Sequence, residues 1–151
     1  MILTGDEIIK EVRAGNIVAD PFDEARVGPN SLDVTLAPLL RTYSRLPLDV
    51  RRDNPTYNWD IPPEGIMLQP GTLYLASTIE RVGSDKYVTY LDGRSSTGRA
   101  GIAIHQTAGR GDLGWSGSWC LEITVVHPVM VYAGMKIGQA TFHAVQGEPS
   151  R

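Results

Sequence analysis

Residues 118–126 read Ser118-Trp119-Cys120-Leu121-Glu122-Ile123-Thr124-Val125-Val126, a run that alternates with period two and therefore predicts a β-strand. Successive side chains of a strand point to opposite faces, so one face here is wholly apolar while the other carries Cys120 and Glu122. The stretch thus predicts a strand with one face on a hydrophobic core and one face open to polar chemistry.

Similar short segments surround this strand, and turn residues separate them at short intervals. They lie at residues 31–36, 72–78, 87–91, 101–106, 129–132 and 136–145. Thr4 and Glu7 form a capping-box pattern before an apolar stripe, which predicts one short helix over residues 5–14. The polar, proline-rich residues 45–63 predict a long surface excursion or a hairpin. Because no segment between the strands can form crossover helices, we predict a mainly β sandwich, barrel or jelly roll.

The bulk properties fit one domain, residues 1–151. A formal net charge of −3 gives no general attraction to nucleic acid or acidic membranes, so an anion must meet a local basic cluster. Cys120 is the one cysteine, which excludes an internal disulfide and is typical of a reducing compartment. The first residues do not resemble a signal peptide, and no apolar run reaches the roughly 20 residues of a membrane span, so we expect a cytoplasmic protein.

Residues 93–99 offer a candidate anion site. Gly93-Arg94-Ser95-Ser96-Thr97-Gly98-Arg99 combines two guanidinium groups, three hydroxyls and backbone N–H groups beside glycines, which together suit a polyphosphate. A solvated surface loop is the alternative. The stretch lacks the lysine and the spacing of a P-loop.

Two carboxylates follow this stretch. Glu122 is the only charge in an apolar run over residues 115–126, and a carboxylate in such surroundings can exchange protons near neutral pH. The alternative is a solvent-facing glutamate on an edge strand. Asp112 lies between Gly111 and Gly114, where it either forms an Asx turn or holds a water or a ribose hydroxyl.

Protein-bound metal chemistry is not indicated. The chain has no Cys-x-x-Cys pair, and His105, His127 and His143 stand outside the zinc-binding motifs, so we expect no zinc. A lone cysteine on a strand is usually small core filling, and we expect this of Cys120 rather than a nucleophile.

Several ordered segments resemble the dCTP deaminase family of the trimeric dUTPase superfamily. They are Arg94-Ser95-Ser96-Thr97-Gly98-Arg99, Thr107-Ala108-Gly109-Arg110-Gly111-Asp112-Leu113-Gly114-Trp115-Ser116-Gly117, Leu121-Glu122, Pro29-Asn30-Ser31-Leu32-Asp33-Val34-Thr35-Leu36 and Gly134-Met135-Lys136-Ile137-Gly138-Gln139. The similarity spans nearly the whole chain, and several motifs in order are far more specific than any one alone.

This resemblance implies a distorted jelly roll, the dUTPase-like β-clip, with one short N-terminal helix. It implies a homotrimer with active sites between subunits and zinc-independent deamination of dCTP at cytosine C4, with Mg²⁺ serving only the triphosphate. dUTP and dTTP are further candidate ligands. Neither nucleic acid nor a membrane is an expected partner.

The resemblance also implies roles for individual residues. Glu122 matches the catalytic glutamate, which acts as general base on water and then as proton donor, and we expect it to be a buried acid beside the cytosine ring. Ser95 and Arg99 match the residues that position the water and the developing tetrahedral centre. The other implied substrate-binding positions are Arg94, Ser96 and Arg110 at the phosphates, Asp112 at the deoxyribose 3′-hydroxyl, and Thr97, Gly98, Cys120 and Leu121. In the dUTPase branch the matching aspartate also directs the water that cleaves the pyrophosphate bond.

Two features depart from the family pattern. Gly109 stands where monofunctional deaminases often carry histidine, and Thr107-Ala108-Gly109 looks more like bifunctional enzymes and dUTPases. We expect this small residue to admit a second water near the α-phosphate. Residues 147–151 end the chain where family members continue into a tail with tyrosine, lysine and glutamine, so we expect closure over the nucleotide to be affected.

The sequence therefore predicts a dCTP deaminase that releases dUTP and ammonia. The alternative is a bifunctional enzyme giving dUMP and diphosphate, or a pyrophosphatase acting on dCTP or dUTP. A catalytically silent nucleotide-binding trimer and a β-sandwich interaction module without a ligand are hypotheses of other classes.

Overall fold

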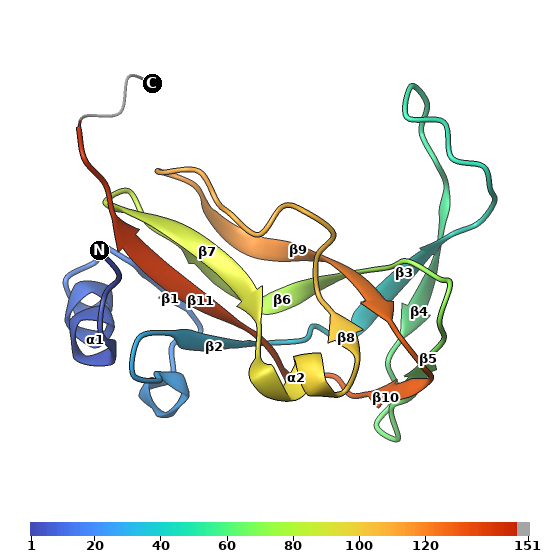
Figure 1. Ribbon diagram of the computed structural model, residues 1–151, viewed down its shortest axis with the longest axis horizontal. Coiled ribbons are helices and arrows are strands. Elements are labelled where there is room, and N and C mark those ends of the chain that lie inside the picture. Colours follow the sequence, from blue (N-terminus) through green and yellow to red (C-terminus); the bar gives the residue numbers. More distant parts are fainter. Residues whose placement is uncertain (148–151) are drawn as a thin grey trace.

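Antiparallel strands make up most of the regular secondary structure of the protein, together with a few short helices (Figure 1). The structure is a computed structural model that describes residues 1–147. The expectation about the chain end concerns residues 147–151, of which 148–151 lie outside the described residues. The helices are α1 (Gly5–Arg13), the 3₁₀ helix η1 (Glu24–Arg26) and α2 (Ser95–Arg99). The strands are β1 (Val18–Asp20), β2 (Leu32–Thr35), β3 (Leu39–Tyr43), β4 (Thr56–Asp60), β5 (Ile66–Leu68), β6 (Tyr74–Gly83), β7 (Tyr87–Gly93), β8 (Ile102–Ala103), β9 (Ser116–Val125), β10 (Val129–Val131) and β11 (Lys136–Ala144).

The strands form three sheets within the described residues. The largest has the order β4-β3-β6-β9-β8, with β1 paired to β6; the second has the order β2-β11-β7, and β5 pairs with β10. Every pairing is antiparallel. The predicted mainly β fold is confirmed, and parallel α/β architecture is absent from the described residues.

Strand β9 has the two faces that its alternating sequence predicts. Leu121 and Ile123 are completely buried, whereas Cys120 is exposed and Glu122 half-buried. One continuous core joins β9 to the strands of the other sheet, and its fully buried side chains include Leu121, Ile123, Val34, Phe142 and Ile137. Hydrophobic burial on one face of each sheet therefore fixes which side chains of β9 remain accessible.

Helix α1 forms where the capping-box pattern predicts it. Thr4 is the N-cap residue, but its hydroxyl makes no capping hydrogen bond; instead the backbone N–H of Gly5 donates to the carbonyl of Pro29 at 2.8 Å. A Cβ on Gly5 would lie only 2.3 Å from the carbonyl oxygen of Gly28, so a glycine is needed at this close approach. The helix is thereby joined to residues 28–29.

The polar segment 45–63 belongs to a hairpin, one of the two structures expected for it. Strands β3 and β4 pair from Leu39 with Asp60 to Tyr43 with Thr56, and their connecting loop projects from the right of Figure 1. The indole N–H of Trp59 donates to the hydroxyl of Thr42 at 2.9 Å across the pair. Within residues 1–147, no helix has the length and apolar composition of a membrane span.

Candidate active site

The predicted anion-binding residues lie on a second helix, α2, where the sequence predicts an irregular segment. Arg94 is the N-cap residue of α2, and Thr97 stabilises this end of the helix through its hydroxyl. The hydroxyl accepts a hydrogen bond from the backbone N–H of Arg94 at 3.0 Å and donates one to the carbonyl oxygen of Arg94 at 2.8 Å. Thr97 is itself buried. The single turn of α2 directs the side chains of Ser95, Ser96 and Arg99 outward, and all three residues are exposed.

These residues line one pocket, which we call the α2 pocket. Its volume is about 340 Å³, and its walls are Gly28, Pro29, Ser31, Asp33, Arg94, Ser95, Ser96, Arg99 and Gln139. Two guanidinium groups and several hydroxyls thus face a common space. The pocket has the charge and the hydrogen-bond donors that a phosphate chain requires.

Asp33 on β2 fixes the orientation of the first of these guanidinium groups. The Nε of Arg94 donates to Asp33 Oδ1 at 2.9 Å, and Lys136 Nζ lies 2.9 Å from Asp33 Oδ2. With Nε engaged, Arg94 Nη1 lies 3.3 Å from the hydroxyl oxygen of Ser96. Asp33 therefore fixes Arg94 at one wall of the α2 pocket, while Arg99 supplies a further positive charge.

Arg110 and Asp112 line a different pocket, which we call the β7-edge pocket. It has a volume of about 400 Å³ and also includes Tyr90 and His143, whose rings meet edge to face with centroids 4.7 Å apart. Residues 109–111 run along the free edge of β7: Leu91 N donates to Gly109 O at 2.6 Å, and Gly111 N donates to Thr89 O at 2.8 Å. Backbone pairing thus presents both charged side chains to one space.

Glu122 lies on the outer face of β9 rather than in the core. Leu75 of β6 is its partner on one side, and on the other its backbone N–H donates to Ile104 O at 2.9 Å, so the residue is not on an edge. The backbone N–H of Gln106 donates to Glu122 Oε2 at 3.1 Å. The acid that we expected to be buried is therefore half-buried in the single chain, with one carboxylate oxygen accepting from a backbone N–H.

Cys120 shares this outer face and is exposed, contrary to the expectation of core filling. It lines a pocket of about 270 Å³ with Arg41 and Ser77. Partial desolvation of the sulfur within this pocket, followed by the negative charge of Glu122, raises the pKa of the Cys120 thiol, and the positive charge of Arg41 opposes this. A raised pKa keeps the thiol protonated at neutral pH, which disfavours a nucleophilic role.

The structure brings the predicted residues together in part. Arg94, Ser95, Ser96 and Arg99 share the α2 pocket, and Arg110 and Asp112 share the β7-edge pocket. Glu122 lines neither of these two pockets. Gly98 belongs to α2, and the Leu121 side chain is completely buried, so only its backbone is available to a ligand.

Gly109 packs closely against β7 and His105. A Cβ at this position would lie 2.7 Å from the carbonyl oxygen of Leu91 and 2.8 Å from His105 Nε2. This contact limits a side chain at Gly109 itself, and the second water expected near the α-phosphate stays a prediction. Close packing against β7 explains a glycine here.

Two residues near the predicted site were not identified from the sequence as site residues. Asp33 orients Arg94, and Gln106 binds Glu122 through a backbone N–H while its side-chain amide donates to Glu122 O at 3.2 Å. Because a backbone N–H donor is present in every residue type except proline, the sequence cannot show which residue will supply it. Among residues 1–147, no group of three or more His, Cys, Asp or Glu side chains is placed to hold a metal ion.

A family model described as dCTP deaminase-like matches residues 2–145. The chain belongs to the dCTP deaminase-like family. A protein of Leptospira biflexa named "dCTP deaminase, dUMP-forming" is 47% identical over 150 residues, which cover 99% of this chain and 86% of that protein. A protein of Clostridium beijerinckii with the same name is 47% identical over 148 residues, which cover 98% of this chain and 85% of that protein. The predicted family is confirmed, and with it the prediction of an enzyme.

Solved structures share the fold. A 2′-deoxycytidine 5′-triphosphate deaminase from Agrobacterium tumefaciens superposes with a TM-score of 0.74 at 21% identity, covering 93% of this chain and 46% of that chain. A mutant dUTPase from phage phi11 of S. aureus superposes with a TM-score of 0.55 at 13% identity, covering 89% of this chain and 94% of that chain. The predicted dUTPase-like fold is confirmed, with the second helix α2 added to the one predicted.

The predicted reaction requires a correction. We expected a dCTP deaminase of this family to stop at dUTP, but the relatives at 47% identity are named as dUMP-forming. The prediction of dUTP as the end product is therefore wrong, and the bifunctional alternative is the better supported one.

Proposed function

We propose that this protein hydrolyses dCTP to dUMP, ammonia and diphosphate. The observation that carries the proposal is the 47% identity, over 99% of the chain, with a relative named "dCTP deaminase, dUMP-forming". Two water molecules are consumed: one replaces the amino group at cytosine C4, and the other breaks the bond between the α- and β-phosphates. The geometry supports this because the two candidate carboxylates, Asp112 and Glu122, have separate surroundings.

In the deamination step, Glu122 takes a proton from water, and the hydroxide attacks C4. The same carboxyl group passes that proton to the ring nitrogen N3, then takes the proton of the new C4 hydroxyl and delivers it to the amino group, which leaves as ammonia as the C4 carbonyl forms. The N–H of Gln106, 3.1 Å from Oε2, restricts the carboxylate to one orientation. Ser95 and Arg99 supply the hydroxyl and guanidinium donors that stabilise the intermediate.

In the phosphate step, Asp112 accepts a proton from the second water and Arg110 neutralises charge on the phosphates. Arg94 and Ser96 of the α2 pocket bind the remaining phosphate oxygens. Mg²⁺ enters as part of the substrate, bound to the triphosphate, where it offsets the negative charge of the leaving diphosphate.

We propose further that a complete site is formed between subunits of a homotrimer. The support is that Glu122, on the outer face of β9, does not line the α2 pocket, which holds Ser95 and Arg99. A second copy of the chain would bring its α2 pocket to that face. Symmetric assembly then repeats the same contact at each interface.

The products formed from dCTP and Mg²⁺ test the proposed reaction. We expect ammonia and dUMP in equal amounts, measured by an ammonia assay and by anion-exchange separation of the nucleotides. dUTP as the only nucleotide product, dCMP without ammonia, or binding without turnover would each contradict the proposal.

Arg99→Ala is expected to lower kcat/KM for dCTP by about a hundredfold or more, because it removes a preorganised cationic donor. Arg13→Ala is a matched control: it deletes an exposed guanidinium that pairs with Glu24 on the surface, and such pairs contribute little. Steady-state kinetics of both variants check the prediction. Equal kinetics for Arg99→Ala and the wild type would remove Arg99 from the site.

Mixing two inactive variants tests the shared site. If Arg99 and Glu122 of one site come from different subunits, reassembly of Arg99→Ala with Glu122→Gln restores intact sites at roughly a quarter of the interfaces. If both residues come from one chain, the mixture stays as inactive as its parents. Sedimentation measurements confirm that the reassembled species is a trimer.

A further inference from the structure

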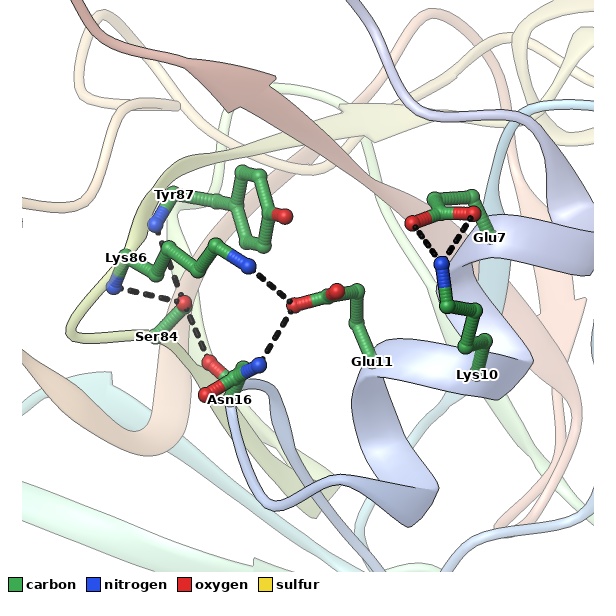
Figure 2. A network of polar contacts seen from close by, with 7 residues as sticks. All are labelled: Glu7, Lys10, Glu11, Asn16, Ser84, Lys86 and Tyr87. Carbon is green, nitrogen blue, oxygen red and sulfur yellow. Dashed lines mark hydrogen bonds and ion pairs between the residues drawn. The ribbon is translucent and has the colours of Figure 1, made fainter.

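A polar network with two buried members, Glu11 and Ser84, joins α1 to the turn between β6 and β7 (Figure 2). Glu11 of α1 is 5% exposed, and its carboxylate accepts from Lys86 Nζ at 3.0 Å and from Asn16 Nδ2 at 2.8 Å. The hydrogen bond from Lys86 and then that from Asn16 hold the pKa of Glu11 below its ordinary value, against the effect of burial. The carboxylate therefore stays charged and paired at neutral pH.

Ser84 is the other half of this network. Its hydroxyl donates to the carbonyl oxygen of Asn16 and accepts from the backbone N–H groups of Lys86 and Tyr87, each at 3.0 Å. The side chain is buried, and every hydrogen-bonding function of the hydroxyl is used. The hydroxyl therefore fixes the shape of the turn and its distance from α1.

The backbone of the same turn holds the loop that carries Asp112. Gly114 N donates to Ser84 O at 2.9 Å, and Trp115 N donates back to Asp112 O at 3.1 Å within the loop. A Cβ on Gly83 would lie 2.1 Å from Trp115 O, so the two segments approach as closely as their backbones allow. The other end of the loop is held by the bond from Gly111 N to Thr89 O.

We propose that Ser84, braced by Glu11, Lys86 and Asn16, is a positioning residue for the loop at residues 109–116. It touches no substrate. It acts by fixing the Gly114 end of the loop, so that Asp112 faces the β7-edge pocket with Arg110. This inference rests on the proposed function, in which Asp112 acts in phosphate cleavage and Glu122 on β9 acts in deamination.

The position of Ser84 therefore has a specific consequence for the products. A less rigid β6–β7 turn displaces Asp112 but does not change the position of Glu122. Glu122 is held by the hydrogen bond from Gln106 and by the pairing of β9 with β6. Phosphate cleavage slows while deamination continues, so dUTP escapes. A variant that merely unfolds part of the protein lowers both reactions together and leaves the product ratio unchanged.

Two variants and one matched control test this. Ser84→Ala removes the hydroxyl, and Glu11→Gln keeps the side-chain shape while removing the charge that binds Lys86. Ile8→Val shortens a fully buried side chain on the same helix without touching the network, and so controls for stability. Products from dCTP and amide hydrogen exchange of residues 109–116 are measured for all three.

We expect both network variants to raise the ratio of dUTP to dUMP by about tenfold to a hundredfold, because small displacements of a catalytic group have effects of this size. We also expect faster exchange at the Gly111 and Gly114 amides, with Ile8→Val like the wild type in both respects. Unchanged exchange and an unchanged product ratio in folded Ser84→Ala and Glu11→Gln would overturn the proposal. If the wild type forms no dUMP, the proposed function has failed, and the exchange measurement alone decides the role of Ser84.

Discussion

Glu122→Gln is expected to lower ammonia release from dCTP by about a hundredfold to ten-thousandfold, the usual contribution of a positioned general acid–base group. The amide has the same shape as the carboxylate, and its oxygen can still accept the hydrogen bond from Gln106 N, now 3.1 Å from Oε2. What the amide lacks is the ability to take a proton from water and return it to the ring. The variant thus removes the chemistry and retains the local packing.

A binding measurement distinguishes the loss of catalysis in this variant from a loss of folding. We expect the Kd of Glu122→Gln for dCTP, measured by calorimetry, to remain within a few-fold of the wild-type value, because the phosphate-binding groups of the α2 pocket are untouched. Glu64→Gln changes an exposed carboxylate in the turn before β5 and is the matched control, with wild-type kinetics expected. Wild-type ammonia release by Glu122→Gln would show that another group performs the proton transfer.

The strands that carry the site were predictable from local pattern. Residues 116–125 and 136–144 alternate clearly, since one side of each strand packs on a common core. Strands β1, β3 and β5 were not predicted; β1 and β5 have only three residues each, too few to show a period. Strand β10 is as short but was predicted, because turn residues lie on both sides of it. Helix α2 was missed for a different reason: serine, threonine and glycine are poor helix formers, and the Thr97 hydroxyl together with tertiary packing stabilises its single turn.

The residue types of the candidate site were also predictable, but their grouping was not. Arg110 and Asp112 share a pocket with Tyr90 because residues 109–111 pair with the edge of β7, and long-range pairing of this kind has no local signal. The role of Gln106 was not predictable because the group that binds the Glu122 carboxylate is its backbone N–H. The close contact of Gly109 with β7 was not predictable either, because it also depends on this long-range pairing.

Asp112→Asn is expected to convert the enzyme from a dUMP-forming to a dUTP-forming one. Asparagine keeps the size and hydrogen-bonding shape of the side chain in the β7-edge pocket but cannot accept a proton from the attacking water. We expect dUMP formation to fall by about a hundredfold or more, while ammonia release stays within a few-fold of the wild type. Separation of the nucleotide products over time measures both.

The matched control for this variant is Asp53→Asn, an exposed carboxylate in the β3–β4 loop that does not line the β7-edge pocket. Because it makes the same chemical change away from that pocket and from the turn that holds the Asp112 loop, it should leave dUMP as the product. If Asp112→Asn abolished both reactions equally, Asp112 would be needed for binding rather than for the second hydrolysis. Release of dUTP by Asp112→Asn alone would instead assign the two hydrolyses to two carboxylates of one chain, and it would place deamination before phosphate cleavage, because dUTP can accumulate only if the amino group leaves first.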